Sequence, residues 1–176
     1  MKSAVYLLSI TLLLMSVSCY CPKGSEAPVQ APEEAVVVFQ DYGPQPFVFD
    51  IEAYTLKNDL YRQVIWTGTY MQMTLMSLAP GDEIGLENHA DTDQFLRVES
   101  GKGIVVMGDS DDVLDFREEV EADFAIFIPA GKWHNLTNTG EEPMKIYSIY
   151  SPVEHPFGTI HKTYEEAMEA DGDHVH

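Results

Sequence analysis

Four side chains that can bind a metal ion lie in two short stretches of the sequence. The stretch "EIGLENHADTDQF" (83–95) carries Glu87, His89 and Gln94, and "IPAGKWHNLTN" (128–138) carries His134. Two imidazoles, a carboxylate and an amide oxygen form a nitrogen and oxygen ligand set that suits Mn, Fe, Zn, Ni or Co. Calcium is disfavoured by two histidines. We expect a divalent metal site, provided that the fold brings these residues together.

Strand geometry gives a way to bring them together. Glu87 and His89 are two positions apart, so on a β-strand they project to the same face. The turn formers in "ADTD" (90–93) predict a hairpin that sets His89 opposite Gln94, because cross-strand partners share a face. The same parity places Leu96 and Val98 on the face of Gln94. A tight turn at 129–131 would redirect the next strand so that His134 points into the same space.

The remainder of the chain predicts an all-β fold. Runs rich in β-branched and aromatic residues recur at short intervals, separated by Gly and Pro, which is typical of a sandwich or barrel. The expected strands are 61–67, 69–79, 82–89, 93–98, 102–107, 112–118, 124–128, 132–138 and 143–150. Residues 35–60 read as lead-in strands, at 35–39 and 46–54. A short helix is expected at 162–170, within a C-terminal arm, helix and tail at 152–176.

The residues at 81–101 and 123–138 resemble the two sequence motifs of the cupin superfamily. Gly81, Glu87, His89, Gln94 and Gly101 fall at the spacings of the first motif, G(X)5HXH(X)3-4E(X)6G. The positions of the second motif, G(X)5PXG(X)2H(X)3N, are met by Pro129, Gly131, His134 and Asn138, with Asp123 in place of the leading glycine. The resemblance spans about residues 61–150. More narrowly, the chain is similar to small single-domain bacterial cupins labelled mannose-6-phosphate-isomerase-like.

The resemblance implies a double-stranded β-helix (jelly-roll) barrel at 61–151 with a divalent metal in its mouth. Glu87 stands where the motif has its first histidine, and Gln94 where it has a glutamate. The set therefore keeps two histidines and one carboxylate. We rank Glu87, His89 and His134 above Gln94, which offers only a neutral oxygen and could equally serve as a structural hydrogen-bonding group.

The sequence leaves the function open between an enzyme and a binding module. A metal with open positions would polarise a carbonyl or hydroxyl group of a small sugar or another oxygenated molecule, as an isomerase, lyase or dioxygenase does. The alternative is a non-catalytic module that binds such a ligand, and a third reading is a barrel without metal. A base beside the site would favour the enzyme, and Glu83, His155 and Tyr70 are candidates. His155 and His161 belong to an arm that could fold over the barrel mouth.

The N-terminal residues predict export. Residues 1–18 combine Lys2 with a short apolar stretch and small residues before Cys19, as in a signal peptide of the lipoprotein kind. Residues 19–34 are rich in Pro and small residues and are typical of a tether. We expect a periplasmic or cell-envelope protein with a lipid on Cys19, although ordinary secretion fits the same residues. The domain after the tether has no cysteine, so it has no disulfide framework.

The overall charge excludes one class of partner. The chain has 29 acidic and 10 basic residues and a formal net charge of -19. Phosphate backbones are held by Lys and Arg, so nucleic acid is not an expected partner. The expected partners are a small-molecule ligand, the membrane through a lipid on Cys19 alone, and a second copy of the chain in a homodimer, as the cupin resemblance implies.

Overall fold

The computed structural model describes residues 37–172. All of these residues belong to one compact unit of the chain, Val36–His176. The expected signal peptide (1–18) and tether (19–34) lie outside them, as do the lipid on Cys19 and the first two residues of the expected strand at 35–39.

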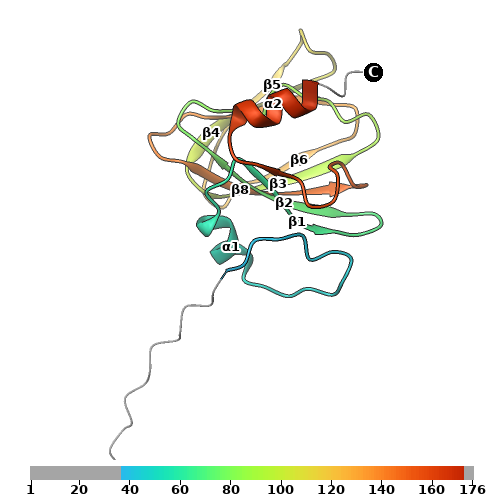
Figure 1. Ribbon diagram of the computed structural model, residues 1–176. Coiled ribbons are helices and arrows are strands. Elements are labelled where there is room, and N and C mark those ends of the chain that lie inside the picture. The colour runs from blue at the N-terminus through green and yellow to red at the C-terminus, as the bar shows by residue number, and fades with distance from the viewer. Residues whose placement is uncertain (1–36, 173–176) are drawn as a thin grey trace, which may run out of the picture. The chain divides into compact units, whose positions relative to one another are not determined.

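Two antiparallel sheets make up the domain, as Figure 1 shows. The larger sheet has six strands in the order β6-β3-β8-β2-β1-β9, and the smaller has three in the order β5-β4-β7. Their bounds are β1 Arg62–Thr67, β2 Gln72–Leu78, β3 Asp93–Ser100, β4 Lys102–Gly108, β5 Phe116–Glu121, β6 Ala125–Ile128, β7 Trp133–Asn138, β8 Met144–Ser151 and β9 Ile160–His161. The expected all-β jelly roll is confirmed.

A single apolar cluster fills the space between the two sheets. It joins Leu96 and Ile146 of the larger sheet to Val105 and Leu136 of the smaller one, each at most 2% exposed. Because both sheets contribute to this cluster, their inner faces form the inside of the barrel.

The central strands of the larger sheet are covered on both faces. On β2, Gln72, Thr74 and Met76 alternate with Met73 and Leu75, and all five are buried. Met76 belongs to the barrel core, whereas Met73 and Leu75 belong to a second apolar cluster. Gln72 and Thr74 therefore share the inner face with Met76, since side chains alternate along a strand.

The second cluster lies under an N-terminal cover, residues 37–57. Phe39, Phe47, Phe49 and Tyr54 of this cover pack against the cluster of Met73 and Leu75, and the cover lies along the outer side of β1 and β2 (Figure 1). The prediction of strands here was wrong. The described residues before 50 pair in no strand, and α1 (Ile51–Lys57) replaces the strand expected at 46–54.

Local chemistry explains why α1 forms. Asp50 is its N-cap, and the Asp50 carboxylate accepts a hydrogen bond from the backbone N–H of Ala53 at 3.0 Å. Such a cap satisfies one of the free N–H groups at the start of a helix. Glu52 in the first turn and Lys57 in the last turn suit the helix dipole.

Residues 82–89 form an extended segment in place of the strand expected there. The segment runs antiparallel to β7 and meets it in two isolated bridges, Glu83 with Thr137 and Glu87 with His134. Between the bridges Gly85 has a φ of +92°. A positive φ turns the backbone away from strand geometry, so the ladder is interrupted at Gly85.

The C-terminal arm returns along the barrel after β8. Its strand β9 pairs with β1, and it ends in α2 (Tyr164–Gly172), close to the helix expected at 162–170. Ala167 of α2 is fully buried in the barrel core. Among the described residues, no helix is both long enough and apolar enough to cross a membrane.

Candidate metal centre

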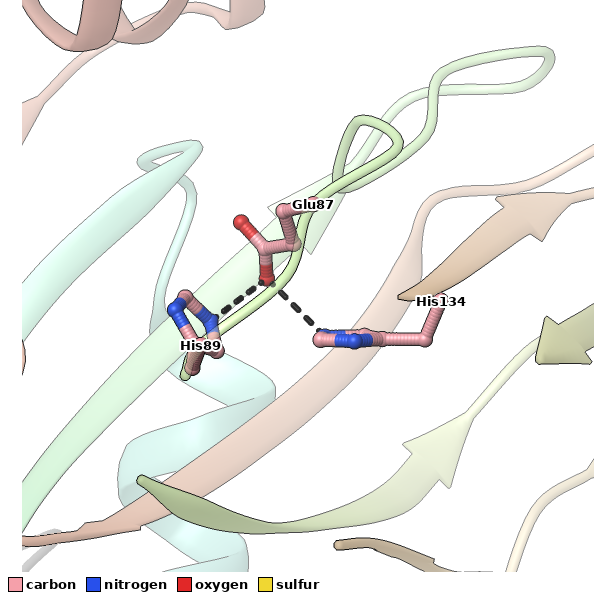
Figure 2. A group of neighbouring side chains, drawn as sticks. All are labelled: Glu87, His89 and His134. Atoms are coloured by element: carbon pink, nitrogen blue, oxygen red, sulfur yellow. Dashed lines mark hydrogen bonds and ion pairs between the residues drawn. The ribbon is translucent and has the colours of Figure 1, made fainter. Parts of the chain in front are cut away.

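Glu87, His89 and His134 meet at one point (Figure 2). Oε1 of Glu87 lies 3.2 Å from Nε2 of His89 and 3.3 Å from Nε2 of His134. One potential ligand atom from each residue lies within 4.8 Å of those of the other two. The side chain of His134 is fully buried, that of His89 is 9% exposed and that of Glu87 is 20% exposed.

Backbone hydrogen bonds position the three residues. Glu87 and His134 exchange both backbone bonds, at 3.0 and 2.9 Å, which fixes the 82–89 segment beside β7. The backbone N–H of Gly131 donates to the carbonyl of His89 at 2.8 Å. Gly131 has a φ of +80°, so the turn at 129–131 demands a residue that tolerates this conformation. The turn thus anchors His89 as well as starting the strand that carries His134.

The second nitrogen of each imidazole is already engaged. Nδ1 of His134 lies 2.9 Å from the carbonyl oxygen of Lys132, and Nδ1 of His89 lies 3.0 Å from Oε1 of Glu154. Both partners accept hydrogen bonds, so when either ring is neutral its proton is placed on Nδ1 and its Nε2 offers a lone pair. The buried Nε2 of His134 has no hydrogen-bond partner of proper geometry.

The electrostatics of the cluster favour ionised groups. Burial alone would raise the pKa of Glu87, but the neighbouring His134, His89 and Arg62 outweigh it and hold the pKa well below its usual range. Burial would lower the pKa of His89, but contacts with Glu154 and Glu87 raise this pKa to about 9. The hydrogen bond to His89 lowers the pKa of Glu154 despite burial. A cation at this point would therefore replace a proton on His89 and meet an ionised carboxylate.

Gln94 does not lie where the hairpin argument put it. It pairs with Ile128 of β6 and Tyr150 of β8, and not with His89. The hairpin prediction was wrong because the 82–89 segment pairs with β7 instead of β3. Gln94 is buried on the inner face of β3 with Leu96 and Val98, as expected. Its Nε2 donates to Oγ of Ser148 at 3.1 Å, and its buried Oε1 has no partner.

A hollow of about 510 Å³ opens beside the cluster. Its wall combines the 82–89 segment, the C-terminal arm and α2, through Ile84, Gly85, Leu86, Glu87, Asn88, His89, Glu154, His155, Pro156, Tyr164 and Met168. His155, one of the three candidate bases, is in this wall. Tyr70 is 78% exposed, and Oε2 of Glu83 accepts a hydrogen bond from Asn135.

Sequence reasoning missed Glu154. The residue lies in no motif, and the sequence indicated only its place beside His155, in an arm for which folding over the barrel mouth was one of two alternatives and a surface position the preferred one. Tyr150 was also missed as a neighbour of the cluster. Its buried ring stands edge-on to His89 at 5.8 Å and to His155 at 5.1 Å.

Comparison with known proteins agrees with the architecture. The cupin domain model matches residues 74–150. The chain is 52% identical over 139 residues to the uncharacterized protein YrkC of Bacillus subtilis, covering 79% of this chain and 75% of YrkC. It is 40% identical over 117 residues to an uncharacterized protein of Acanthamoeba polyphaga mimivirus, covering 66% and 71%. The chain belongs to the cupin superfamily.

A solved structure supports the same conclusion at the level of the backbone. The crystal structure of a Bacillus halodurans protein superposes on this cupin with a TM-score of 0.73 at 55% identity. The match covers 74% of this chain and 98% of that one. The names of these three relatives state no activity.

The chemistry of the cluster fits a divalent cation. Both Nε2 atoms face one carboxylate oxygen, and one of them is buried without a hydrogen bond. Buried polar atoms are rarely left without a partner, and a cation between these atoms would supply one. Two imidazoles and a carboxylate form a borderline set that suits Mn, Fe, Zn, Ni or Co.

Proposed function

We propose that this cupin holds a divalent metal ion through Glu87, His89 and His134 and binds a small oxygenated molecule beside it. The observation that carries the proposal is the state of the two imidazoles. Each has its Nδ1 engaged by an acceptor and its Nε2 turned toward Oε1 of Glu87. Metal-binding histidines commonly show this division between their two nitrogens.

The hollow beside the cluster supports a small ligand. Its volume of about 510 Å³ is in the range of small-molecule sites. The wall combines polar groups of His89, Glu154 and His155 with apolar surface of Leu86 and Met168. Such a lining suits a small sugar or another compact molecule with several oxygens. A bound divalent metal would supply Lewis acidity toward a carbonyl or hydroxyl oxygen.

The position of His155 favours turnover over binding alone. It is the candidate base that shares the wall of the hollow with Glu87 and His89. Its ring is held edge-on by Tyr150, which also contacts His89. An imidazole in this place can exchange a proton with a bound hydroxyl group. Isomerisation, as in the mannose-6-phosphate-isomerase-like label, is one of three reaction types that suit such a site, with lyase chemistry and dioxygenation.

Metal analysis tests the proposal directly. Untagged protein purified without chelator is expected to carry about one divalent metal per chain, since three ligands serve one ion. A His89→Ala, His134→Ala double variant is expected to carry none, and His161→Ala serves as a histidine control outside the cluster. A wild type without stoichiometric metal, or a double variant that keeps it, would contradict the proposal.

Ligand binding and turnover need a second experiment. Metal-loaded protein is screened by thermal shift against a panel of sugars and hydroxy acids, with the double variant as control. Any compound that stabilises only the loaded wild type is then incubated with it and followed by NMR. New signals that disappear in His155→Ala indicate catalysis, and an unchanged ligand indicates a binding module.

We also propose that the protein is exported and anchored through Cys19. The support is the sequence of residues 1–34 alone, with its apolar stretch, small residues before Cys19 and Pro-containing tether. Labelled palmitate should enter the protein in bacterial cells and should not enter a Cys19→Ser variant. Label that survives this substitution would contradict the lipid anchor.

A further inference from the structure

Glu154 ties the C-terminal arm to the candidate metal centre. Its Oε1 lies 3.0 Å from Nδ1 of His89, while Nε2 of the same ring lies 3.2 Å from Glu87. When Glu154 accepts a hydrogen bond from Nδ1–H of the neutral ring, Nε2 is left with the lone pair that a metal needs. The carboxylate thus selects both the tautomer and the orientation of His89.

Gln72 holds the arm where Glu154 can reach His89. The Gln72 side chain accepts a hydrogen bond from the backbone N–H of His155 and donates one to the carbonyl of His155, both at 2.8 Å. Gln72 is fully buried at the start of β2, so its amide is a fixed support. The residue after Glu154 is therefore clamped on both its backbone groups.

A second contact supports the arm farther along. Oδ2 of Asp41, in the N-terminal cover, accepts from the backbone N–H of Gly158 at 3.1 Å and from the hydroxyl of Thr67 at 2.6 Å. The arm is thus joined to both the barrel and the cover around the position of Glu154.

The simpler explanation is a surface ion pair of little consequence. Exposed pairs of this kind contribute little to stability. His89, however, is 9% exposed, and Glu154 is 27% exposed. His134 has the equivalent contact from Nδ1 to the carbonyl of Lys132. Both imidazoles are oriented from the side away from Glu87, which a chance surface contact at one of them does not explain.

We propose that Glu154 is a positioning residue for the metal centre, acting through His89, and that Gln72 holds Glu154 in place. The inference rests on the proposed metal site and adds a residue from outside both cupin motifs to it. Partners of this kind, behind a metal-binding histidine, typically change metal affinity by about 10- to 100-fold when removed.

The test compares Co²⁺ affinity among four proteins by competition with a chelating dye. We expect E154A to bind Co²⁺ about 10- to 100-fold more weakly than the wild type. E154Q should recover most of the loss, because its amide oxygen can still accept from Nδ1. D91N is the matched control: it removes one negative charge two positions from His89, and Asp91 is exposed and makes no hydrogen bond or ion pair among the described residues.

A spectroscopic readout separates positioning from general stability. In the Zn²⁺-loaded wild type and E154Q, the Nδ1 proton of His89 should give an NMR signal protected from exchange with water, and E154A should lose it. Unfolding of each protein in chelator checks that the fold is intact, and E154S replaces E154A if that variant fails the check.

The outcomes distinguish this inference from the proposed function. A wild type that binds no Co²⁺ stoichiometrically contradicts both. A wild type that binds Co²⁺, with E154A within about 2-fold of it, overturns the role of Glu154 alone. Equal losses in E154Q and E154A would mean that charge, and not orientation, is responsible, and would also overturn it.

The role of Gln72 is tested by a double-mutant cycle. Q72A should weaken Co²⁺ binding, and the Q72A, E154A double variant should bind no more weakly than E154A, because Gln72 acts through Glu154. Additive losses would contradict the clamp.

Discussion

Glu87 occupies the position of the first histidine in the usual cupin motif, and both imidazoles of the site turn toward it. Its carboxylate is held ionised by its neighbours. In this chain the negative charge of the candidate ligand set therefore comes from the first motif position, while Gln94, in the position of the motif glutamate, bonds to Ser148.

Neutralising Glu87 tests its place in the ligand set. Glu87→Gln keeps the size of the side chain but removes the charge and one good ligand atom. We expect divalent metal affinity to fall by more than about 100-fold. This loss is larger than the one expected for a residue, such as Glu154, that only hydrogen-bonds to a metal-binding histidine. Isothermal titration with Co²⁺ measures the change. Gln94→Ala is the comparison, and a larger loss there than in Glu87→Gln would reverse our ranking of the two residues.

The charged contacts of His89 predict a pH dependence for the protein in chelator. The pKa of His89 is raised from 6.5 to about 9, so its contribution to stability is fully present below about pH 6.5 and is lost as pH rises through 9. The free energy of unfolding should fall by up to about 3 kcal/mol over this range. Denaturant unfolding at several pH values measures it.

The carboxylates act in the opposite direction. The pKa values of Glu87 and Glu154 are lowered, so their contribution is present above about pH 4.5 and is lost as pH falls further. Metal-free protein should be most stable between these limits. A His89→Gln variant should lose the decline above pH 6.5, and a variant that keeps it would show that another group is responsible.

The sequence motifs predicted the members of the cluster better than its geometry. Glu87, His89 and His134 do meet, but through pairing of their own segments and not through the expected hairpin. Glu154 could not be predicted, because its contact with His89 depends on the path of an arm that carries no motif. Asp123 replaces a motif glycine and still adopts a φ of +73°, which Asp tolerates better than most residues.

At the scale of elements, periodicity predicted the barrel strands and failed in the N-terminal cover. Burial alternates along β3 because the barrel core takes every second residue, whereas β2 is buried on both faces. In the cover, aromatic residues spaced like those of a strand pack as a cap on the sheet, with Phe47 stacked between Tyr42 and Phe49. Asp50 as an N-cap was the signal for α1, and the apolar run before it obscured that signal.

The cover and the candidate metal centre lie on opposite faces of the larger sheet, so they should respond separately to mutation. Leu75→Ala opens a cavity under the cover and should cost about 2–5 kcal/mol of unfolding free energy. Metal affinity should stay unchanged in the folded variant. Denaturant unfolding and Co²⁺ titration measure the two effects. Val48→Ala, at a 97% exposed position of the cover, is the control, expected to stay within about 0.5 kcal/mol.

At the scale of the whole molecule, metal binding should stabilise the fold. A metal at 100 times its Kd adds about 2.7 kcal/mol to the free energy of unfolding, a shift in Tm of roughly 5–15 °C. Calorimetry with and without Co²⁺ measures this shift. With a net charge of -19, the chain will also attract cations weakly. The His89→Ala, His134→Ala variant is therefore essential, and an equal shift in that variant would place the effect outside the cluster.

The arm that carries Glu154 also determines where the chain can be truncated for recombinant expression. A fragment confined to the family match, residues 74–150, would retain Glu87, His89 and His134. It would discard Glu154, and with β1 and the start of β2 it would also discard Gln72. Such a fragment would keep Glu87, His89 and His134 but would lose the carboxylate of Glu154 that contacts Nδ1 of His89. A recombinant fragment should therefore begin no later than residue 37 and extend through the end of α2.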